Sequence, residues 1–273
     1  MPEQDRTDRF IQAFPKYLLL FTILFLVTIY VLVWLIDFRQ VYVPGLTEWK
    51  DQFPAQIFWL HTFREAGIIE NFQWLFLGLS VLISFLILMK LPESKAKVKW
   101  GWMFLTLGLF LMLLEDSINI RHILSYHFSI HFYDGSVGSL EWQRSGLRTA
   151  VEMSFYTFLG SIMLSAFYII YRYKIDKSSF IYLTIGFVVY GISGFTSATR
   201  NIGNWYEIVG IKILYTLTEG LNLSWNADSI IIYQRPLGFY FMDYVVEESL
   251  ELIGATLILC ALISVIQNKI APK

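Results

Sequence analysis

The sequence predicts an all-α integral membrane protein, a bundle of about six transmembrane helices with amphipathic interfacial segments on the outer side. Apolar residues make up 56% of the chain and charged residues only 16%, a balance typical of membrane proteins. The apolar residues are gathered in runs of about 20, the length that crosses the hydrocarbon core of a bilayer. No linker, low-complexity tract or internal repeat separates these runs, so residues 1–273 are predicted to form a single domain.

Six runs have the length of a span. The first contains twenty residues without a charge and is longer than the core of a secretory signal, so we expect it to be retained. The fifth is the shortest and the richest in glycine and serine. The predicted spans are residues 17–36, 67–89, 100–124, 149–171, 180–196 and 241–266.

The connections between the runs are of two kinds. Residues 90–99 and 172–177 are short and basic. Residues 46–64 mix aromatic side chains with charges, which is typical of an amphipathic segment at the membrane interface. The longest connection, residues 200–240, carries an apolar piece from Trp205 to Leu217. The short basic turns and the amphipathic segments are therefore expected on opposite faces.

The distribution of lysine predicts the orientation. With six spans, both termini and both short basic turns fall on one side, which collects nine of the eleven lysines. Basic residues in short connections mark the cytoplasmic side. Both termini are therefore expected in the cytoplasm. Cys260 is the one cysteine, which rules out an intramolecular disulfide or a cysteine metal site.

The third run ends in polar residues where lipid would otherwise be expected. On a continuous helix, Glu115, Asn119 and His122 share one face at i, i+4 and i+7, with Asp116 beside it. The acids would then lie about 13 Å below the outer end of the span. Ionisable groups at such depth are costly and usually functional.

The last run carries a second acidic stripe. Asp243, Glu247 and Glu251 follow one another at i, i+4 and i+8, with Glu248 next to them. Repulsion and desolvation disfavour four charged carboxylates there, so either some are protonated or cations compensate them. Since the second and fourth runs also place acids in the outer half, we expect the acidic faces to converge on one polar cavity.

These residue types suggest roles. Carboxylates dominate, so a hard or borderline divalent metal ion is a possible cofactor, and arginines suit anionic groups. The candidate acid–base residues are Glu115, Asp116, His122 and Glu251. The candidate metal ligands are Glu115, Glu247, Glu248 and Glu251. The candidate substrate-binding residues are Arg121, Arg200 and Asn119.

A purely structural interpretation stays open, in which Arg–Glu pairs tie helix ends together. It applies best near the interface, to Glu65, Glu70, Glu152, Arg144 and Arg148. Several catalytic motifs are absent, including His-Glu-x-x-His, Gly-x-Ser-x-Gly, the phosphate-binding P-loop and the Glu-x-x-His of di-iron bundles. The zinc hydrolases that include alkaline ceramidases need a histidine pair in a late span, and this chain has no histidine after His131.

Three stretches resemble an uncharacterised group of bacterial multi-pass membrane proteins. Leu114 to Arg121 is similar to their acidic pair followed by serine and arginine, although a Trp-Gly-Gln associated with it is missing. Glu247 to Ala255 resembles the Glu-Glu-x-x-Glu-x-x-Gly-Ala of their last helix, and Arg64 to Glu70 resembles a segment that opens an early span. The resemblance implies an acidic core and a bacterial inner membrane, and it carries no established activity.

Three functions are compatible with these patterns. The first is a protein that binds a cation or a polar lipid headgroup in its outer half and acts on a lipid-type substrate there. The second is a proton- or cation-coupled transporter, which needs polar groups that continue toward the cytoplasm. The third is a non-catalytic subunit or assembly factor of a larger membrane complex. The expected partners are the lipid bilayer and other membrane subunits, and not nucleic acid.

Overall fold

The computed structural model describes residues 2–39, 58–64, 66–133, 141–172, 176–218, 231–232 and 235–270. Within these ranges the chain is helical apart from short turns and a short antiparallel ribbon of β1 (Ile231–Ile232) and β2 (Arg235–Pro236). Six helical stretches are long and apolar enough to cross a membrane. They are Gln12–Phe38, Phe58–Lys90, Glu93–Ile118, Gly146–Arg172, Lys177–Thr199 and Leu237–Asn268.

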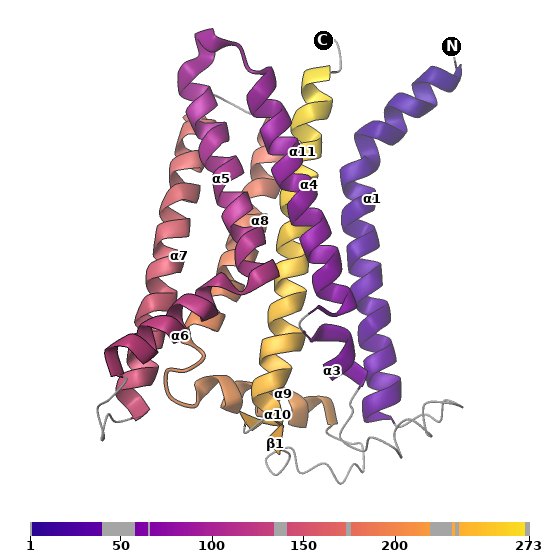
Figure 1. Ribbon diagram of the computed structural model, residues 1–273. Coiled ribbons are helices and arrows are strands. Elements are labelled where there is room, and N and C mark those ends of the chain that lie inside the picture. The colour runs from indigo at the N-terminus through magenta and orange to yellow at the C-terminus, as the bar shows by residue number, and fades with distance from the viewer. Residues whose placement is uncertain are drawn as a thin grey trace.

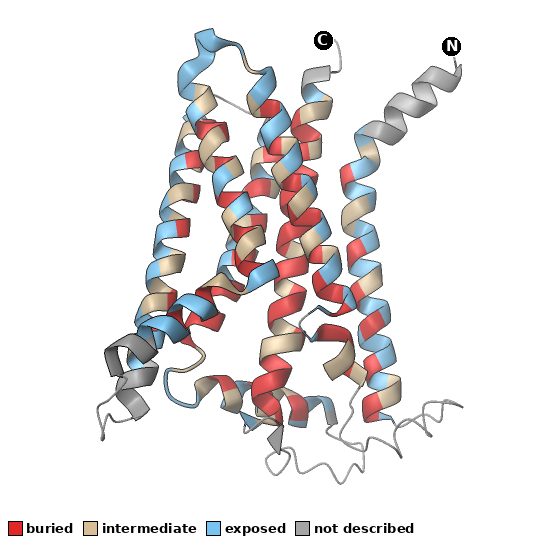
Figure 2. Ribbon diagram, viewed as in Figure 1, coloured by how far each residue is buried: buried red, intermediate tan, exposed pale blue. Residues whose placement is uncertain are grey.

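The long helices run side by side and α11 lies at their centre (Figure 1). They are α1 (Pro2–Val33), α4 (Ile68–Lys90), α5 (Ala96–Ile118), α7 (Glu141–Arg172), α8 (Lys177–Thr199) and α11 (Glu248–Ile270). Helices α1, α4 and α8 pack on α11, and α5 packs between α4 and α7. In the candidate spans, 78% of the apolar window around α11 is buried, against 22% for α1 (Figure 2). The outer faces of the bundle are apolar, as contact with lipid requires.

A pair of glycines explains the close packing of α8 on α11. A Cβ added at Gly186 would lie 2.9 Å from Cγ1 of Ile258 and 3.0 Å from the carbonyl oxygen of Gly254. Side chains larger than hydrogen would therefore push the two helices apart. Small residues at such crossings let helix backbones approach closely in membrane proteins.

The two ends of the bundle differ in structure. The chain termini lie at one end, together with the turn that joins α4 to α5 (Figure 1). The opposite end, called the far end below, holds the short helices α3 (Phe58–Phe63), α6 (Ile120–Tyr133), α9 (Trp205–Thr218) and α10 (Leu237–Tyr240). Most of the predicted interfacial segment 46–64 lies outside the described residues; its described end forms α3. The carboxylate of Asp37, at the end of the first span, accepts hydrogen bonds from the amides of Phe58 and Trp59 at the start of α3.

The third predicted span, residues 100–124, is wrong at its outer end. Helix α5 stops at Ile118, because Asn119 has the left-handed backbone angles φ 50° and ψ 40°. Asparagine enters this region more readily than most residues. Helix α6 then leaves α5 in a new direction (Figure 1). The single helical face predicted to hold Glu115, Asn119 and His122 therefore does not exist.

Candidate functional site

A small polar cavity of about 40 Å³ lies in the far half of the bundle. Its walls come from α4, α5, the start of α6, the residue that follows α8, the segment Phe241–Glu247 and the start of α11. Seven of the described residues around it carry carboxyl groups and two carry guanidinium groups. The lining residues are Glu70, Glu115, Asp116, Asn119, Arg121, Arg200, Asp243, Tyr244, Glu247, Glu248 and Glu251. The structure thus brings together the acids of three predicted spans.

A π-helical segment shapes the acidic wall. Residues Phe241–Glu247 form this segment directly before α11. Its i→i+5 hydrogen bonds widen the turn and change which side chains share a face. Asp243, Glu247 and Glu251 reach the cavity as the predicted stripe, and Glu248 joins them. Such insertions into helices are frequent at functional sites.

Gln73 of α4 joins two of the acids. Its Nε2 donates hydrogen bonds to Oδ2 of Asp116 at 2.5 Å and to Oε2 of Glu251 at 2.8 Å. The hydroxyl of Tyr190 donates to the same oxygen of Asp116 at 2.5 Å. The hydroxyl of Ser193 donates to Oε1 of Glu251 at 2.8 Å. Helices α4, α5, α8 and α11 are therefore tied together by one buried network.

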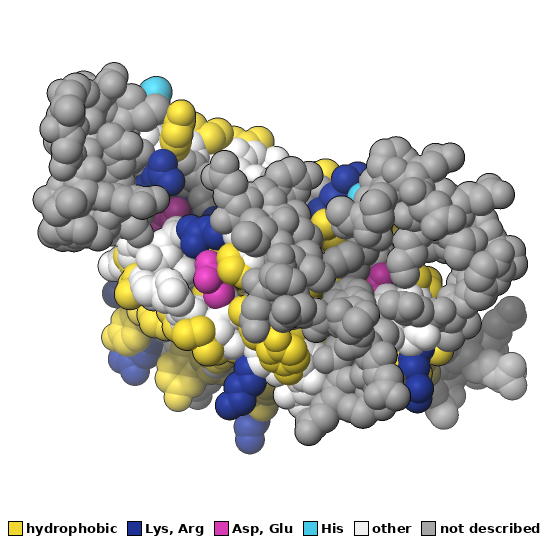
Figure 3. Space-filling view, turned by 90° about the horizontal axis from the view of Figure 1, so that it is seen from below, with side chains coloured by type: hydrophobic (Ala, Val, Ile, Leu, Met, Phe, Trp, Pro, Cys, Tyr) yellow, Lys and Arg dark blue, Asp and Glu magenta, His cyan; other side chains and the backbone are white. Residues whose placement is uncertain are grey.

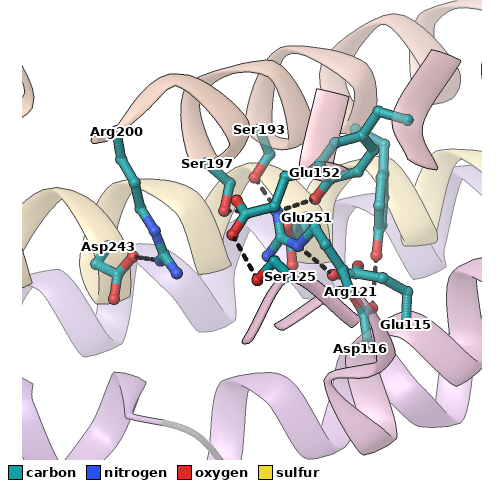
Figure 4. Close-up of polar contacts among 12 residues, drawn as sticks. Glu115, Asp116, Arg121, Ser125, Glu152, Ser193, Ser197, Arg200, Asp243 and Glu251 are labelled. Atoms are coloured by element: carbon teal, nitrogen blue, oxygen red, sulfur yellow. Dashed lines mark hydrogen bonds and ion pairs between the residues drawn. The ribbon is translucent and has the colours of Figure 1, made fainter. Parts of the chain in front are cut away.

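Arg121 neutralises the other acid of α5. Its Nε lies 3.0 Å from Oε1 of Glu115, and its Nη1 donates to the hydroxyls of Tyr156 at 2.5 Å and Ser197 at 2.9 Å (Figure 4). The turn at Asn119 directs Arg121 back toward α5. Burial alone would lower the pKa of Arg121, but the charge of Glu115 raises it above the ordinary value. The guanidinium therefore stays charged.

A second cation and a tyrosine meet the acids of the π-helical segment. Arg200, which follows α8, forms an ion pair with Asp243 (Figure 4). The hydroxyl of Tyr206 in α9 donates to Oε2 of Glu247 at 2.7 Å. Burial and the charge of Glu247 raise the pKa of Tyr206, so its hydroxyl keeps its proton. Seen from the far end, described carboxyl groups reach the surface only at small, separate points (Figure 3).

Glu248 differs from the other acids. Its side chain lines the cavity and is 9% exposed. Its Oε2 atom is buried and has no hydrogen-bond partner among the described residues. A buried carboxylate oxygen without a partner is costly, so it calls for a proton or a ligand. This oxygen is therefore a candidate contact for a ligand in the cavity.

The four predicted metal ligands all line the cavity, but no metal site is preformed. Glu115 is paired with Arg121, Glu247 with Tyr206, and Glu251 with Gln73 and Ser193. Among the described residues, no group of three or more His, Cys, Asp or Glu side chains is arranged to hold a metal ion. The divalent metal and the acid–base roles stay predictions.

The structure places the other residues that the sequence suggests for the site in different positions. Asn119 and Arg200 line the cavity, whereas the side chain of His122 lies outside the described residues. Glu70, treated in the sequence as an interfacial residue, also lines the cavity, and it accepts a hydrogen bond from the amide of Ala66. Glu152 is buried beside Ser125 without lining the cavity.

Several partners of the acids were not singled out in the sequence. The sequence gives no specific reason to assign Gln73, Tyr156, Tyr190 or Tyr206 to the site, although the structure bonds all four to its charged residues. One signal exists, because Ser193 near the end of the fifth run and Ser197 directly after the run are four residues apart and so share a helical face. The tyrosines have no such signal, since aromatic residues are common throughout the chain.

The chain matches no protein-family model, no curated protein and no solved structure. Its fold and cavity define a class in physical terms. It is a six-helix bundle of membrane-spanning length, with a buried, carboxyl-rich cavity at one end.

Proposed function

We propose that the protein binds a small cation, or the cationic headgroup of a larger molecule, in the carboxyl cavity. The observation that carries this proposal is the unpartnered Oε2 of Glu248, buried in a cavity with seven carboxyl groups and two guanidinium groups. Among the described residues that line the cavity, the two guanidinium groups are outnumbered by the seven carboxyl groups. Protons or a bound cation would balance the difference, because charges out of water need compensation.

The size of the cavity limits the cation. A space of about 40 Å³ accommodates roughly three water-sized groups. A monovalent metal ion with water or a primary ammonium group fits this space. A divalent ion would have to draw Glu247 or Glu251 away from present partners. The carboxyl groups of Asp116 and Glu251, linked through Gln73, supply proton-transfer groups for chemistry on a bound molecule.

The lysine distribution bears on which side of the membrane the cavity is nearer to. Lys90, Lys95, Lys97 and Lys99 lie at the end of α4, in the turn that follows it and at the start of α5, at the same end of the bundle as the termini. The positive-inside rule supports a cytoplasmic position for this end and, with it, a cavity in the outer half of the membrane. A bacterial inner membrane is part of the proposal and rests on the resemblance stated above.

Coupled transport is less well supported than cation binding. The reason lies in the polar contacts of the half of the bundle that is nearer the chain termini. Hydroxyls there donate to carbonyls of their own helix, as in Ser80 to Phe76 and Ser264 to Cys260. The polar network of the cavity is not continued by these groups. A proton or cation path across the bundle therefore has no visible polar lining among the described residues.

The proposal is tested by cation-dependent thermal stability in lipid nanodiscs. Na⁺, Mg²⁺, Mn²⁺ and methylammonium are each titrated into the native protein, Glu248→Gln and Glu93→Gln. Glu93 is an exposed acid in the turn before α5 and serves as the matched control. A cation that binds the folded state stabilises it by about 2.7 kcal/mol at one hundred times its Kd.

We expect saturable stabilisation of the native protein and Glu93→Gln by at least one cation, and at least tenfold weaker affinity in Glu248→Gln. The proposal is overturned if no cation stabilises the native protein, or if Glu248→Gln responds as the native protein does.

A further inference from the structure

An apolar groove of about 550 Å³ lies between α7 and α8. It extends along α7 from Met153 to Phe167 and along α8 from Phe195 back to Phe180. Fourteen residues of helix correspond to about 21 Å. The groove is therefore long enough for much of a hydrocarbon chain, and its volume lies in the range of ligand pockets.

Two tyrosines separate this groove from the carboxyl cavity. Tyr156 and Tyr190 both line the groove. Their hydroxyls belong to the polar network, since Tyr190 donates to Asp116 and Tyr156 accepts from Arg121, each at 2.5 Å. A Cβ at Gly194 would lie 2.8 Å from the ring of Tyr156, so this glycine lets the ring pack against α8. Only one layer of side chains stands between the apolar and the polar space.

The groove is open along glycines of both helices. Gly160 of α7 and Gly191 of α8 line it, and an added Cβ at either position would meet no atom within 4 Å. Larger side chains at these positions would fill the groove without forcing the helices apart. These two glycines therefore offer a way to block the groove selectively.

We infer that the groove holds the hydrocarbon tail of a single-chain amphiphile whose primary ammonium group enters the carboxyl cavity between Tyr156 and Tyr190. The inference rests on the proposed function and specifies the ligand. Charge complementarity selects a cationic head, because carboxyl groups outnumber guanidinium groups around the cavity. The small cavity admits an ammonium group and excludes a sugar or a phosphocholine. The apolar wall of the groove accounts for the tail.

The test uses a long-chain primary amine with a photoreactive diazirine in mid-chain. A carboxylic acid of the same chain and diazirine is the matched probe. Each probe is crosslinked to the protein in nanodiscs, and the labelled peptides are mapped by mass spectrometry. The proteins compared are native, Gly191→Leu, Gly160→Leu and Glu248→Gln, each checked for an unchanged melting temperature in the absence of probe.

We expect the amine to label α7 and α8 at least fivefold more than the acid does. Gly191→Leu and Glu248→Gln should each lower labelling by the amine at least fivefold. Methylammonium, which has no tail, should stabilise Gly191→Leu as it does the native protein. Equal labelling by both probes would mean that the groove takes up any lipid, and would overturn the inference.

The two proposals fail in different ways. If methylammonium and the metal ions stabilise no form of the protein, the proposed function fails and this inference fails with it. If a small cation binds but neither glycine variant changes labelling by the amine, the inference about the groove fails alone.

Discussion

The two halves of the last span, Leu237–Asn268, use their polar residues in opposite ways. Toward the far end, Glu247 and Glu251 are bonded to side chains of other helices, from Tyr206, Gln73 and Ser193. Toward the termini, Thr256 and Ser264 donate to carbonyls of α11 itself, with one further hydroxyl contact from Thr256 to Thr22. One half is organised by a shared polar network and the other by close packing. Loss of a polar group should therefore disturb the far half, and added volume the half near the termini.

The largest effect is expected for Arg121→Ala. This change leaves Glu115 buried without its ion pair, and breaking a buried pair costs about 3–5 kcal/mol. The free energy of unfolding in mixed micelles measures the effect. Arg235→Ala is the control, because that arginine is 45% exposed in its ion pair with Glu207 and should contribute at most about 1 kcal/mol. Equal losses in both variants would remove the distinction between buried and exposed pairs.

Added volume should act at the crossing of α8 and α11. Gly186→Leu places a side chain against Ile258 and the backbone of Gly254, and overpacking costs about 1–3 kcal/mol. Gly191→Leu, in the same helix, has open space and should change the free energy of unfolding by about 0.5 kcal/mol or less. A larger loss in the free energy of unfolding for Gly191→Leu than for Gly186→Leu would contradict this prediction.

A matched pair in α4 tests the polar network directly. Gln73 and Ser80 are both fully buried. Gln73→Leu deprives Asp116 and Glu251 of a donor and should cost about 1–3 kcal/mol. Ser80→Ala removes a hydroxyl bonded to Phe76 of its own helix and should cost about 0.5 kcal/mol or less. Thermal unfolding of both variants in nanodiscs measures the two effects. Equal losses of stability in Gln73→Leu and Ser80→Ala would contradict the prediction.

The smallest effect concerns the start of α8, outside the spans. The carboxylate of Asp176 caps the helix by accepting from the amide of Ser179 at 2.9 Å. Burial raises the pKa of Asp176, but the hydrogen bonds from Ser179 and Ser178 outweigh it and hold the pKa below its ordinary value. Because the folded-state pKa is lowered, the cap stabilises above the unfolded pKa, near 3.8, and its contribution is lost as pH falls through the folded-state pKa.

Asp176→Ala should cost about 0.5–2 kcal/mol at neutral pH. Asp176→Asn keeps a capping oxygen that does not titrate, so its stability should lack this acid-dependent step. Melting temperatures of the three proteins between neutral and acidic pH check the prediction. An acid-dependent step of equal size in Asp176→Asn would show that other groups cause it.

The sequence predicts the positions of the long helices and most of the acids that line the cavity. Hydrophobic runs predict the long helices because span length is set by the bilayer. The break at Asn119 was missed because one asparagine in an apolar run does not stop a helix by composition. The π-helical segment at Phe241–Glu247 was missed for a similar reason, since one extra residue in a turn leaves the hydrophobic pattern nearly unchanged.

The partners of the acids depend on helix register. That Gln73 and Tyr190 both meet Asp116 follows from how α4 and α8 are rotated and shifted against α5 and α11. Several rotations bury the same apolar residues, so the sequence alone could propose convergence without choosing the pairs. That Oε2 of Glu248 is buried without a hydrogen-bond partner among the described residues likewise depends on the positions of the neighbouring helices, which the sequence does not fix.

The central claim is that the carboxyl cavity takes up a cation through Glu248. Infrared difference spectroscopy measures it most directly, by following the absorption of protonated carboxyl groups when methylammonium is added. We expect the cation to remove the absorption of at least one protonated carboxyl in the native protein, and we expect Glu248→Gln to lack this change. Identical spectra with and without cations in the native protein would contradict the claim, because the acids would then be satisfied by protons and arginines alone.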